Sequence, residues 1–138
     1  MATQPKSRRT TPRAVAIVPA AGAGRRMGTP KLLLPWNSLT VIDSTIAAWR
    51  LSCVEQVIVV VSPSDEPLAD ACRAAGATVV VPLSPPADMK ASLQAGIRHL
   101  RQSQGTDDLD CLLVAPADMP WIEPATIDRL VAEFSATP

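Results

Sequence analysis

Short, nearly uninterrupted apolar runs alternate along the chain with longer stretches in which apolar residues recur every three or four positions. The first pattern predicts buried strands and the second predicts amphipathic helices. We expect strands at 14–19, 57–62, 77–81 and 110–115, a short extended piece at 32–34, and helices at 40–51, 64–75, 89–101 and from 124 onward. Apolar strands separated by helices are typical of a parallel sheet covered on both faces. The sequence therefore predicts an α/β, Rossmann-like fold with a mostly parallel sheet.

Helix ends carry signals of their own. Thr40, with Asp43 three residues later, is close to a capping box, and Gly76 suits the end of a helix. Ile42, Ile46 and Trp49 fall on one face of their helix, and the last helix has Ile127, Leu130, Val131 and Phe134 on one face.

Composition narrows the class of protein. A chain of 138 residues suits one domain, and 47% apolar residues are enough for a core. No apolar run approaches membrane-spanning length, and the basic start of the chain lacks the apolar segment of a secretory signal. We therefore expect a disordered basic tail at 1–13, a folded domain at 14–138, a cytoplasmic location and neither a membrane nor a nucleic-acid partner.

The three cysteines, Cys53, Cys72 and Cys111, are odd in number and widely spaced. This spacing fits neither a metal site nor a disulfide framework, so we expect buried free thiols in a reducing compartment. The single histidine, His99, has no partner motif and is interpreted as a surface residue. A Ser-His-Asp or Cys-His mechanism therefore has little support.

The candidate chemistry begins after the first strand, where residues 17–31 read IVPAAGAGRRMGTPK. Gly22, Gly24 and Gly28 allow the backbone to approach an anion and to adopt positive φ. Arg26 suits forked binding of a phosphate, and Lys31 adds a point charge. The plain alternative is a glycine-rich turn. The combination of glycines with fixed positive charge favours a nucleotide-phosphate loop, although neither the G-x-G-x-x-G nor the P-loop template matches.

Two further polar residues follow other predicted elements. Asp118 lies just past the last strand, where a carboxylate suits Mg²⁺, although a capping or turn aspartate is equally expected from its position alone. Ser92, in the first turn of a helix, is interpreted as a contact to a base or sugar; a purely local hydrogen bond is the alternative. Asp107, Asp108 and Asp110 precede the strand and are interpreted as a solvated loop at the opposite end of the sheet.

The two loops are expected to share one edge of the sheet. Ligands of parallel α/β proteins bind outside the carboxyl ends of the strands, and both the glycine-rich loop and the Asp118 loop follow strands. We therefore expect them to meet across one cleft. Of the tryptophans, Trp49 is expected in the core and Trp121, just after Asp118, near a substrate.

The glycine-rich loop resembles the signature A-A-G-x-S-x-R-M-G-x-x-K of the MobA-like nucleotidyltransferases, and among them most closely that of the molybdenum-cofactor cytidylyltransferases. The matching residues are Ala20, Ala21, Gly22, Arg26, Met27, Gly28 and Lys31. Gly24 stands where that branch usually has Ser. The segments DMKASLQAGI (88–97) and LLVAPADMP (112–120) also match. The resemblance implies a nucleotide-diphospho-sugar transferase-like fold.

The resemblance also implies an activity, the transfer of CMP from CTP to a phosphorylated acceptor such as molybdopterin, with release of pyrophosphate. It assigns Arg26 and Lys31 to the phosphates, Asp118 to Mg²⁺, and Ser92 to the base and ribose. The backbone of Ala20, Ala21 and Gly22 would then lie against the base. Because the guanylyltransferase branch tends to have A-G-G at this point, the methyl group of Ala21 favours CTP over GTP.

The chain stops at Pro138, whereas family members usually continue through acceptor contacts and a second acidic metal ligand. We therefore expect a C-terminally short domain with an open sheet edge that invites oligomerisation. Two other functions stay open. One is a sugar-phosphate or other small-molecule nucleotidyltransferase, including the isoprenoid cytidylyltransferases, whose lysine lies farther from the arginine. The other is a non-catalytic nucleotide-binding module.

Overall fold

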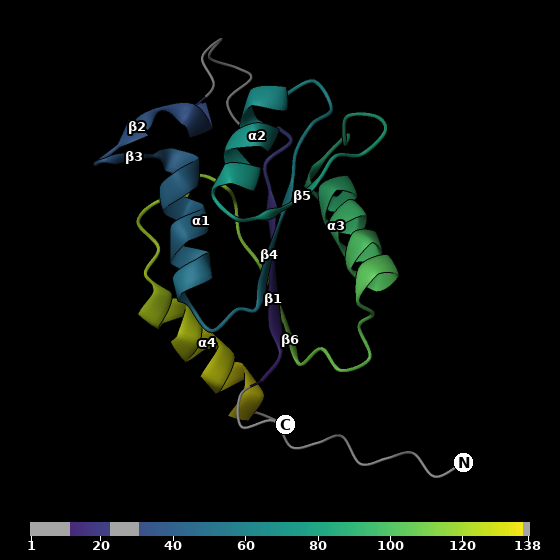
Figure 1. The fold of residues 1–138 in the computed structure, drawn as a ribbon. Helices are drawn as coiled ribbons and strands as arrows, with labels where there is room; N and C mark the ends of the chain where they lie inside the picture. The colour runs from purple at the N-terminus through teal and green to yellow at the C-terminus, as the bar shows by residue number, and fades with distance from the viewer. Residues whose placement is uncertain (1–11, 23–30, 137–138) are drawn as a thin grey trace.

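The computed structural model describes residues 12–22 and 31–136. At the centre of the fold is a four-stranded, fully parallel sheet in the order β5-β4-β1-β6 (Figure 1). Its strands are β1 (Ala14–Pro19), β4 (Gln56–Val60), β5 (Thr78–Val80) and β6 (Cys111–Val114). The helices are α1 (Val41–Leu51), α2 (Glu66–Ala74), α3 (Met89–Ser103) and α4 (Pro124–Ala136). A small antiparallel hairpin of β2 (Pro35–Trp36) and β3 (Leu39–Thr40) precedes α1. The predicted α/β fold is confirmed.

One predicted element is wrong. The extended piece expected at 32–34 begins instead as a 3₁₀ helix, η2 (Lys31–Leu33). Three apolar residues carry no usable period, so the pattern does not separate a strand from a helical turn. The helical turn ends before Leu34, which precedes Pro35 and is therefore biased toward extended backbone.

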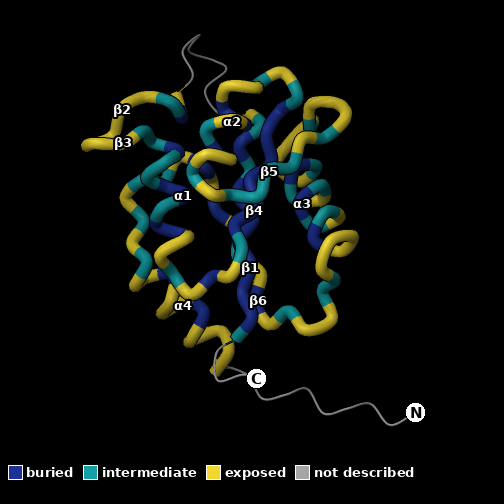
Figure 2. Tube along the Cα trace, viewed as in Figure 1, coloured by how far each residue is buried: buried dark blue, intermediate teal, exposed yellow. Residues whose placement is uncertain are grey.

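Helices cover both faces of the sheet, as predicted. Figure 1 shows α1, α2 and α4 on one side and α3 alone on the other. The alternation of β1 side chains divides the core accordingly, because Ala16 and Val18 pack with the three helices while Val15 and Ile17 pack toward α3. Figure 2 shows the central strands as the most buried part of the molecule.

The outer strand β6 is less well covered than β1. In the described part of the chain it pairs only with β1, and Leu112 and Val114, which lie opposite Val15 and Ile17, are exposed on the α3 side. The last helix is only partly buried: Ile127 and Val131 are enclosed, whereas Leu130 and Phe134 are 56% and 61% exposed. The amphipathic period selects four positions on one face, but only two of them reach the core.

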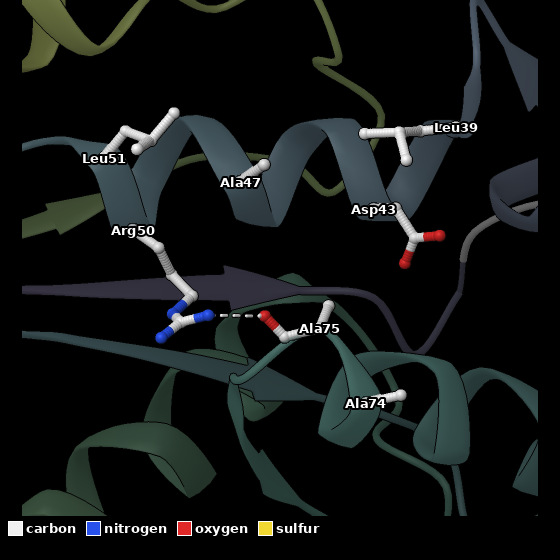
Figure 3. A pocket seen from close by; sticks show the side chains of 7 residues that line it. All are labelled: Leu39, Asp43, Ala47, Arg50, Leu51, Ala74 and Ala75. Atoms are coloured by element: carbon white, nitrogen blue, oxygen red, sulfur yellow. Dashed lines mark hydrogen bonds between the residues drawn. The ribbon is translucent and has the colours of Figure 1, made fainter.

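The ends of α1 and α2 follow the predicted signals. Thr40 caps α1 by accepting a hydrogen bond from the Asp43 amide at 3.2 Å. Gly76, just past α2, has φ +93°, which glycine adopts at little cost. The Arg50 guanidinium of α1 packs over this glycine and donates to the Ala75 carbonyl at 3.2 Å, as Figure 3 shows.

Arg13 is a correction to the expected tail, because its side chain is buried at 6% exposure. It donates to Glu55 at 2.7 Å, to Asp108, and to the side chain of Gln104 at 3.1 Å. Its backbone amide donates to Asp110 at 2.7 Å. The hydrogen bond that Arg13 donates to Glu55 raises the pKa of Arg13, against the lowering effect of burial. Asp108 and Asp110 are thus partners of a buried arginine rather than members of a purely solvated loop.

Two of the three cysteines are buried. Cys72 and Cys111 are free thiols in the interior, as expected, but Cys53 is exposed. None of the helices in the described ranges combines the length and apolarity needed to cross a membrane.

Candidate functional site

A cleft of about 330 Å³ opens at the carboxyl edge of the sheet, where β1 and β6 end and α3 begins. Four residues expected at the site from the sequence line it together: Ala21, Gly22, Ser92 and Asp118. The remaining described lining residues are Pro19, Pro86, Ala87, Asp88, Met89, Pro116 and Ala117. As predicted, the described start of the glycine-rich loop and the Asp118 loop line one cleft.

The β1 side of the cleft is fixed by the sheet. The Ala20 amide donates to the Val60 carbonyl at 2.8 Å, so this residue still belongs to the strand pair, and its side chain is buried. Ala21 and Gly22 follow directly and line the cleft. Gly22 does not adopt the positive φ expected from the sequence, and a Cβ built there meets no described atom within 4 Å. Within the described ranges, no residue therefore fills the space beside Gly22.

The β6 side of the cleft is held by α1. Ala117 is buried, and its carbonyl accepts a hydrogen bond from Thr45 Oγ1 at 2.9 Å. Thr45 is fully buried within α1, so the contact fixes a loop backbone to a helix interior. The next residue, Asp118, is exposed and lines the cleft. Its carboxylate is thus held at the cleft by a fixed backbone.

The first turn of α3 forms the third side. Ser92 is 3% exposed, and its amide donates to the Asp88 carbonyl at 3.2 Å. Asp88 is the N-cap of α3 and accepts from the Ala91 amide at 2.8 Å through Oδ1. Gly96, one turn later, lets the helix lie close to Ile17, because a Cβ there would be 2.9 Å from Ile17 Cγ2. Close packing on β1 therefore brings this turn to the cleft.

Asp88 is a lining residue that the sequence reasoning did not select. Asp88 is the first residue of the segment 88–97, which resembles the family. An aspartate directly before a helix is expected to cap it, and Asp88 does cap α3. Only the fold shows that the same carboxylate lines the cleft. The signal in the sequence was its spacing of four residues from Ser92, which is one helical turn.

The described lining carries two carboxylates, Asp88 and Asp118, and no basic residue. Lys31 is exposed at the start of η2 and does not line the cleft, while Gly24, Arg26 and Gly28 lie outside the described residues. Within the described ranges, no group of three or more acidic, histidine or cysteine side chains is placed to hold a metal. Exposed carboxylates nevertheless fit Mg²⁺, which uses one or two protein carboxylates and completes its shell with water and phosphate oxygens.

An aromatic pair lies beside the Asp118 loop. The rings of Trp36, in β2, and Trp121 have centroids 6.3 Å apart and are tilted by 55°, a geometry that aromatic pairs favour. Both side chains are partly exposed, whereas Trp49 is in the core, as expected. Trp121 contacts Trp36 and does not line the cleft.

A larger depression of about 560 Å³ lies elsewhere, between α1 and α2 (Figure 3). Leu39, Asp43, Ala47, Arg50 and Leu51 line one side of it, and Ala74 and Ala75 the other. It contains none of the residues expected at a site from the sequence. The cleft at the sheet edge, although smaller, is the one that the motifs share.

A family model described as the MobA-like NTP transferase domain matches residues 16–138. The chain belongs to this family. A 2-C-methyl-D-erythritol 4-phosphate cytidylyltransferase of Burkholderia cenocepacia is 35% identical over 132 residues, which are 93% of this chain and 55% of that protein.

Solved structures of related proteins have the same fold. A nucleotidyl transferase from Methanothermobacter thermautotroptrophicus is 32% identical, with a TM-score of 0.72 over 87% of this chain and 57% of that one. The Mycobacterium tuberculosis protein Rv0371c in complex with manganese is 28% identical, with a TM-score of 0.68 over 91% of this chain and 61% of that one. The chain spans about half to three fifths of the length of these relatives.

Proposed function

We propose that this chain binds CTP and transfers CMP to a phosphorylated small-molecule acceptor, releasing pyrophosphate. The observation that supports the proposal most directly is the cleft at the carboxyl edge of the sheet. It collects Gly22, Ser92 and Asp118, which come from three separate motifs on β1, α3 and β6. Such an edge is where α/β sheets bind their ligands.

In this reaction an acceptor phosphate oxygen attacks the α-phosphorus of CTP, and the bond to the pyrophosphate oxygen breaks. The acceptor is already ionised, so the reaction needs no general base. Negative charge grows on the phosphoryl oxygens and on the leaving group, so positioning and electrostatics supply most of the catalysis. We assign Arg26 to the β- and γ-phosphates and Lys31 to the α-phosphate.

The nucleotide then lies along the β1 side of the cleft. The backbones of Ala20, Ala21 and Gly22 lie against the base, and Ser92 contacts the base or ribose. The open space beside Gly22 supports this placement, because a side chain there would project into volume that no described atom fills. Gly24 and Gly28 are assigned to the same phosphate loop.

Asp118 is the proposed ligand of a divalent cation. Its exposed carboxylate lines the cleft, and hard oxygen ligands of this kind suit Mg²⁺. A bound cation supplies positive charge to phosphate oxygens, which the acidic described lining does not. The manganese complex of Rv0371c supports a divalent cation in the family.

Two acceptors remain in competition. The loop signature favours molybdopterin, because the lysine spacing matches the molybdenum-cofactor branch. The Burkholderia relative favours 2-C-methyl-D-erythritol 4-phosphate, the compound for which that enzyme is named. We therefore propose to measure pyrophosphate release with CTP and each acceptor in turn. Release with only one of them assigns the acceptor, and nucleotide binding without release by either would favour a non-catalytic module.

The nucleotide preference is tested by binding and the role of the lysine by turnover. Calorimetry with CTP and GTP, each with and without Mg²⁺, should show tighter binding of CTP because Ala21 narrows the base side of the cleft. Lys31→Ala should reduce turnover by orders of magnitude without unfolding the protein. The matched control is Lys90→Ala, an exposed lysine that does not line the cleft. Equal turnover of the two variants would contradict the role of Lys31.

A further inference from the structure

The α3 side of the cleft carries a carboxylate that the proposed reaction does not use. Asp88 lines the cleft together with Ser92, one helical turn away. Its Oδ1 accepts the cap hydrogen bond from the Ala91 amide at 2.8 Å, and Oδ2 takes no part in this cap. The cap fixes where the carboxylate stands, so it is a preorganised hydrogen-bond acceptor rather than a mobile surface charge.

The position of Asp88 decides which part of a nucleotide it meets. Under the proposed function, the cation and the phosphate oxygens that it binds lie at the β6 side, near Asp118, while the base lies between the backbone at Gly22 and Ser92 of α3. The nucleoside is then the part that faces the first turn of α3. A carboxylate repels phosphate oxygens and only accepts hydrogen bonds, so its partner must be a donor group of the nucleoside.

We propose that Asp88 accepts a hydrogen bond from the exocyclic amino group of cytosine and so makes the cleft favour CTP over UTP. Cytosine carries this amino donor where uracil carries a carbonyl oxygen. The Asp88 carboxylate accepts a hydrogen bond from the amino group of cytosine and repels the carbonyl oxygen of uracil. The inference rests on the proposed function, and it adds the residue that reads the base.

The expected size of the effect follows from comparable contacts. A carboxylate accepting from the cytosine amino group is a recognised base contact, and a good contact of this class discriminates on the order of 10- to 100-fold against the wrong base. We therefore expect the wild-type protein to bind CTP more tightly than UTP by roughly that ratio in the presence of Mg²⁺.

Asp88→Asn is the informative variant. Asparagine is as good an N-cap as aspartate, so α3 and the cleft keep their structure. The variant loses the charge, and its amide offers a donor to the uracil carbonyl. Calorimetric titration with CTP and UTP should show the ratio of the two dissociation constants falling toward one, with UTP binding improved.

Two controls separate this role from that of a cap. Asp88→Ser keeps a cap but shortens the side chain, so it should weaken CTP binding without improving UTP binding. Asp65→Asn changes the N-cap of α2 in the same way, and Asp65 does not line the cleft, so the CTP-to-UTP ratio should stay at the wild-type value.

The alternative contacts of Asp88 give different results. If Asp88→Asn leaves the CTP-to-UTP ratio unchanged but alters the preference for CTP over 2′-deoxy-CTP, the carboxylate contacts the ribose and the proposal is overturned. If Asp88→Asn changes only the Mg²⁺ concentration that CTP binding requires, the carboxylate contacts the cation, and this result also overturns the proposal.

The role of Asp88 and the proposed function are overturned by different results. Binding of CTP with an unchanged base preference in Asp88→Asn overturns the role of Asp88 and leaves the proposed function standing. No binding of any triphosphate by the wild-type protein overturns both. Circular dichroism of each variant confirms that it is folded.

Discussion

The hydroxyl oxygen of Thr45 lies 2.9 Å from the carbonyl oxygen of Ala117, which joins the middle of α1 to the loop that carries Asp118. The same hydroxyl lies 2.9 Å from the Val41 carbonyl, so its one proton serves two acceptors. The contact spans 72 residues of sequence and is fully buried on the Thr45 side. A residue with no place in the proposed chemistry therefore holds the proposed metal ligand in position.

Thr45→Val should destabilise the protein and weaken its response to divalent cations. The variant keeps the shape but leaves the Ala117 carbonyl without its buried donor, which costs about 1–2 kcal/mol of unfolding free energy. Urea denaturation measures the free energy of unfolding. The Mg²⁺ concentration that CTP binding requires shows whether Asp118 is still placed to bind the cation. Thr45→Ser, which keeps the hydroxyl, should retain the Mg²⁺ response; equal loss in both variants would argue against the contact.

Gly96→Ala should destabilise α3, although alanine is the better helix former. The gain in helix propensity is about 1 kcal/mol, whereas overpacking a rigid core contact costs about 1–3 kcal/mol. The new Cβ would meet Ile17 Cγ2 at 2.9 Å, and this branched, fully buried side chain has little freedom to move. Thermal denaturation should give a lower midpoint. Gln94→Ala, on the exposed face of α3, provides the control and should be neutral or stabilising.

Arg13→Met should cost about 2 kcal/mol, somewhat less than the loss of a fully enclosed ion-pair partner, because Glu55 and Asp108 are partly exposed. The arginine ties the start of β1 to the loop before β4 and to the loop before β6. Urea denaturation measures the loss. The exposed pair of Arg73 and Asp70 supplies the control, since Arg73→Met should change stability by less than about 0.5 kcal/mol.

Stability should fall as the pH rises above 9, through Cys72. Burial raises the pKa of this thiol from 9.0 to about 12, with smaller contributions from the Asp43 and Asp65 charges. The unfolded chain loses this proton near pH 9 while the folded protein keeps it until about pH 12. Between these values the free energy of unfolding falls by up to about 1.4 kcal/mol per pH unit. Denaturation curves of wild type and Cys72→Ala across this range measure the difference, and equal slopes would contradict it.

The sequence predicted the order of elements well because its signals are local. The apolar runs of the strands and the caps at Thr40 and Gly76 depend on neighbouring residues alone, and the structure confirms them. The meeting of Gly22, Ser92 and Asp118 was also predictable, because the carboxyl ends of parallel strands share one edge.

What the sequence could not show depends on distant partners. Arg13 follows a basic stretch and reads as part of a tail, but its partners Glu55 and Asp108 are brought to it only by the fold. Leu130 and Phe134 lie at apolar helical positions, yet burial of α4 depends on which of its sides meets the sheet. Gly22 was expected to use its backbone freedom, but its φ is not positive, and no described atom lies within 4 Å of a Cβ placed there.

The contact between Trp36 and Trp121 provides an intrinsic circular dichroism signal for movement beside Asp118. Two indoles this close couple their electronic transitions, and a coupled pair gives a split circular dichroism band whose amplitude depends on the spacing and tilt of the rings. One indole belongs to the β2 hairpin and the other to the segment just after Asp118, so a ligand that shifts this segment changes the band without any added label. The enclosed Trp49 supplies an internal reference signal.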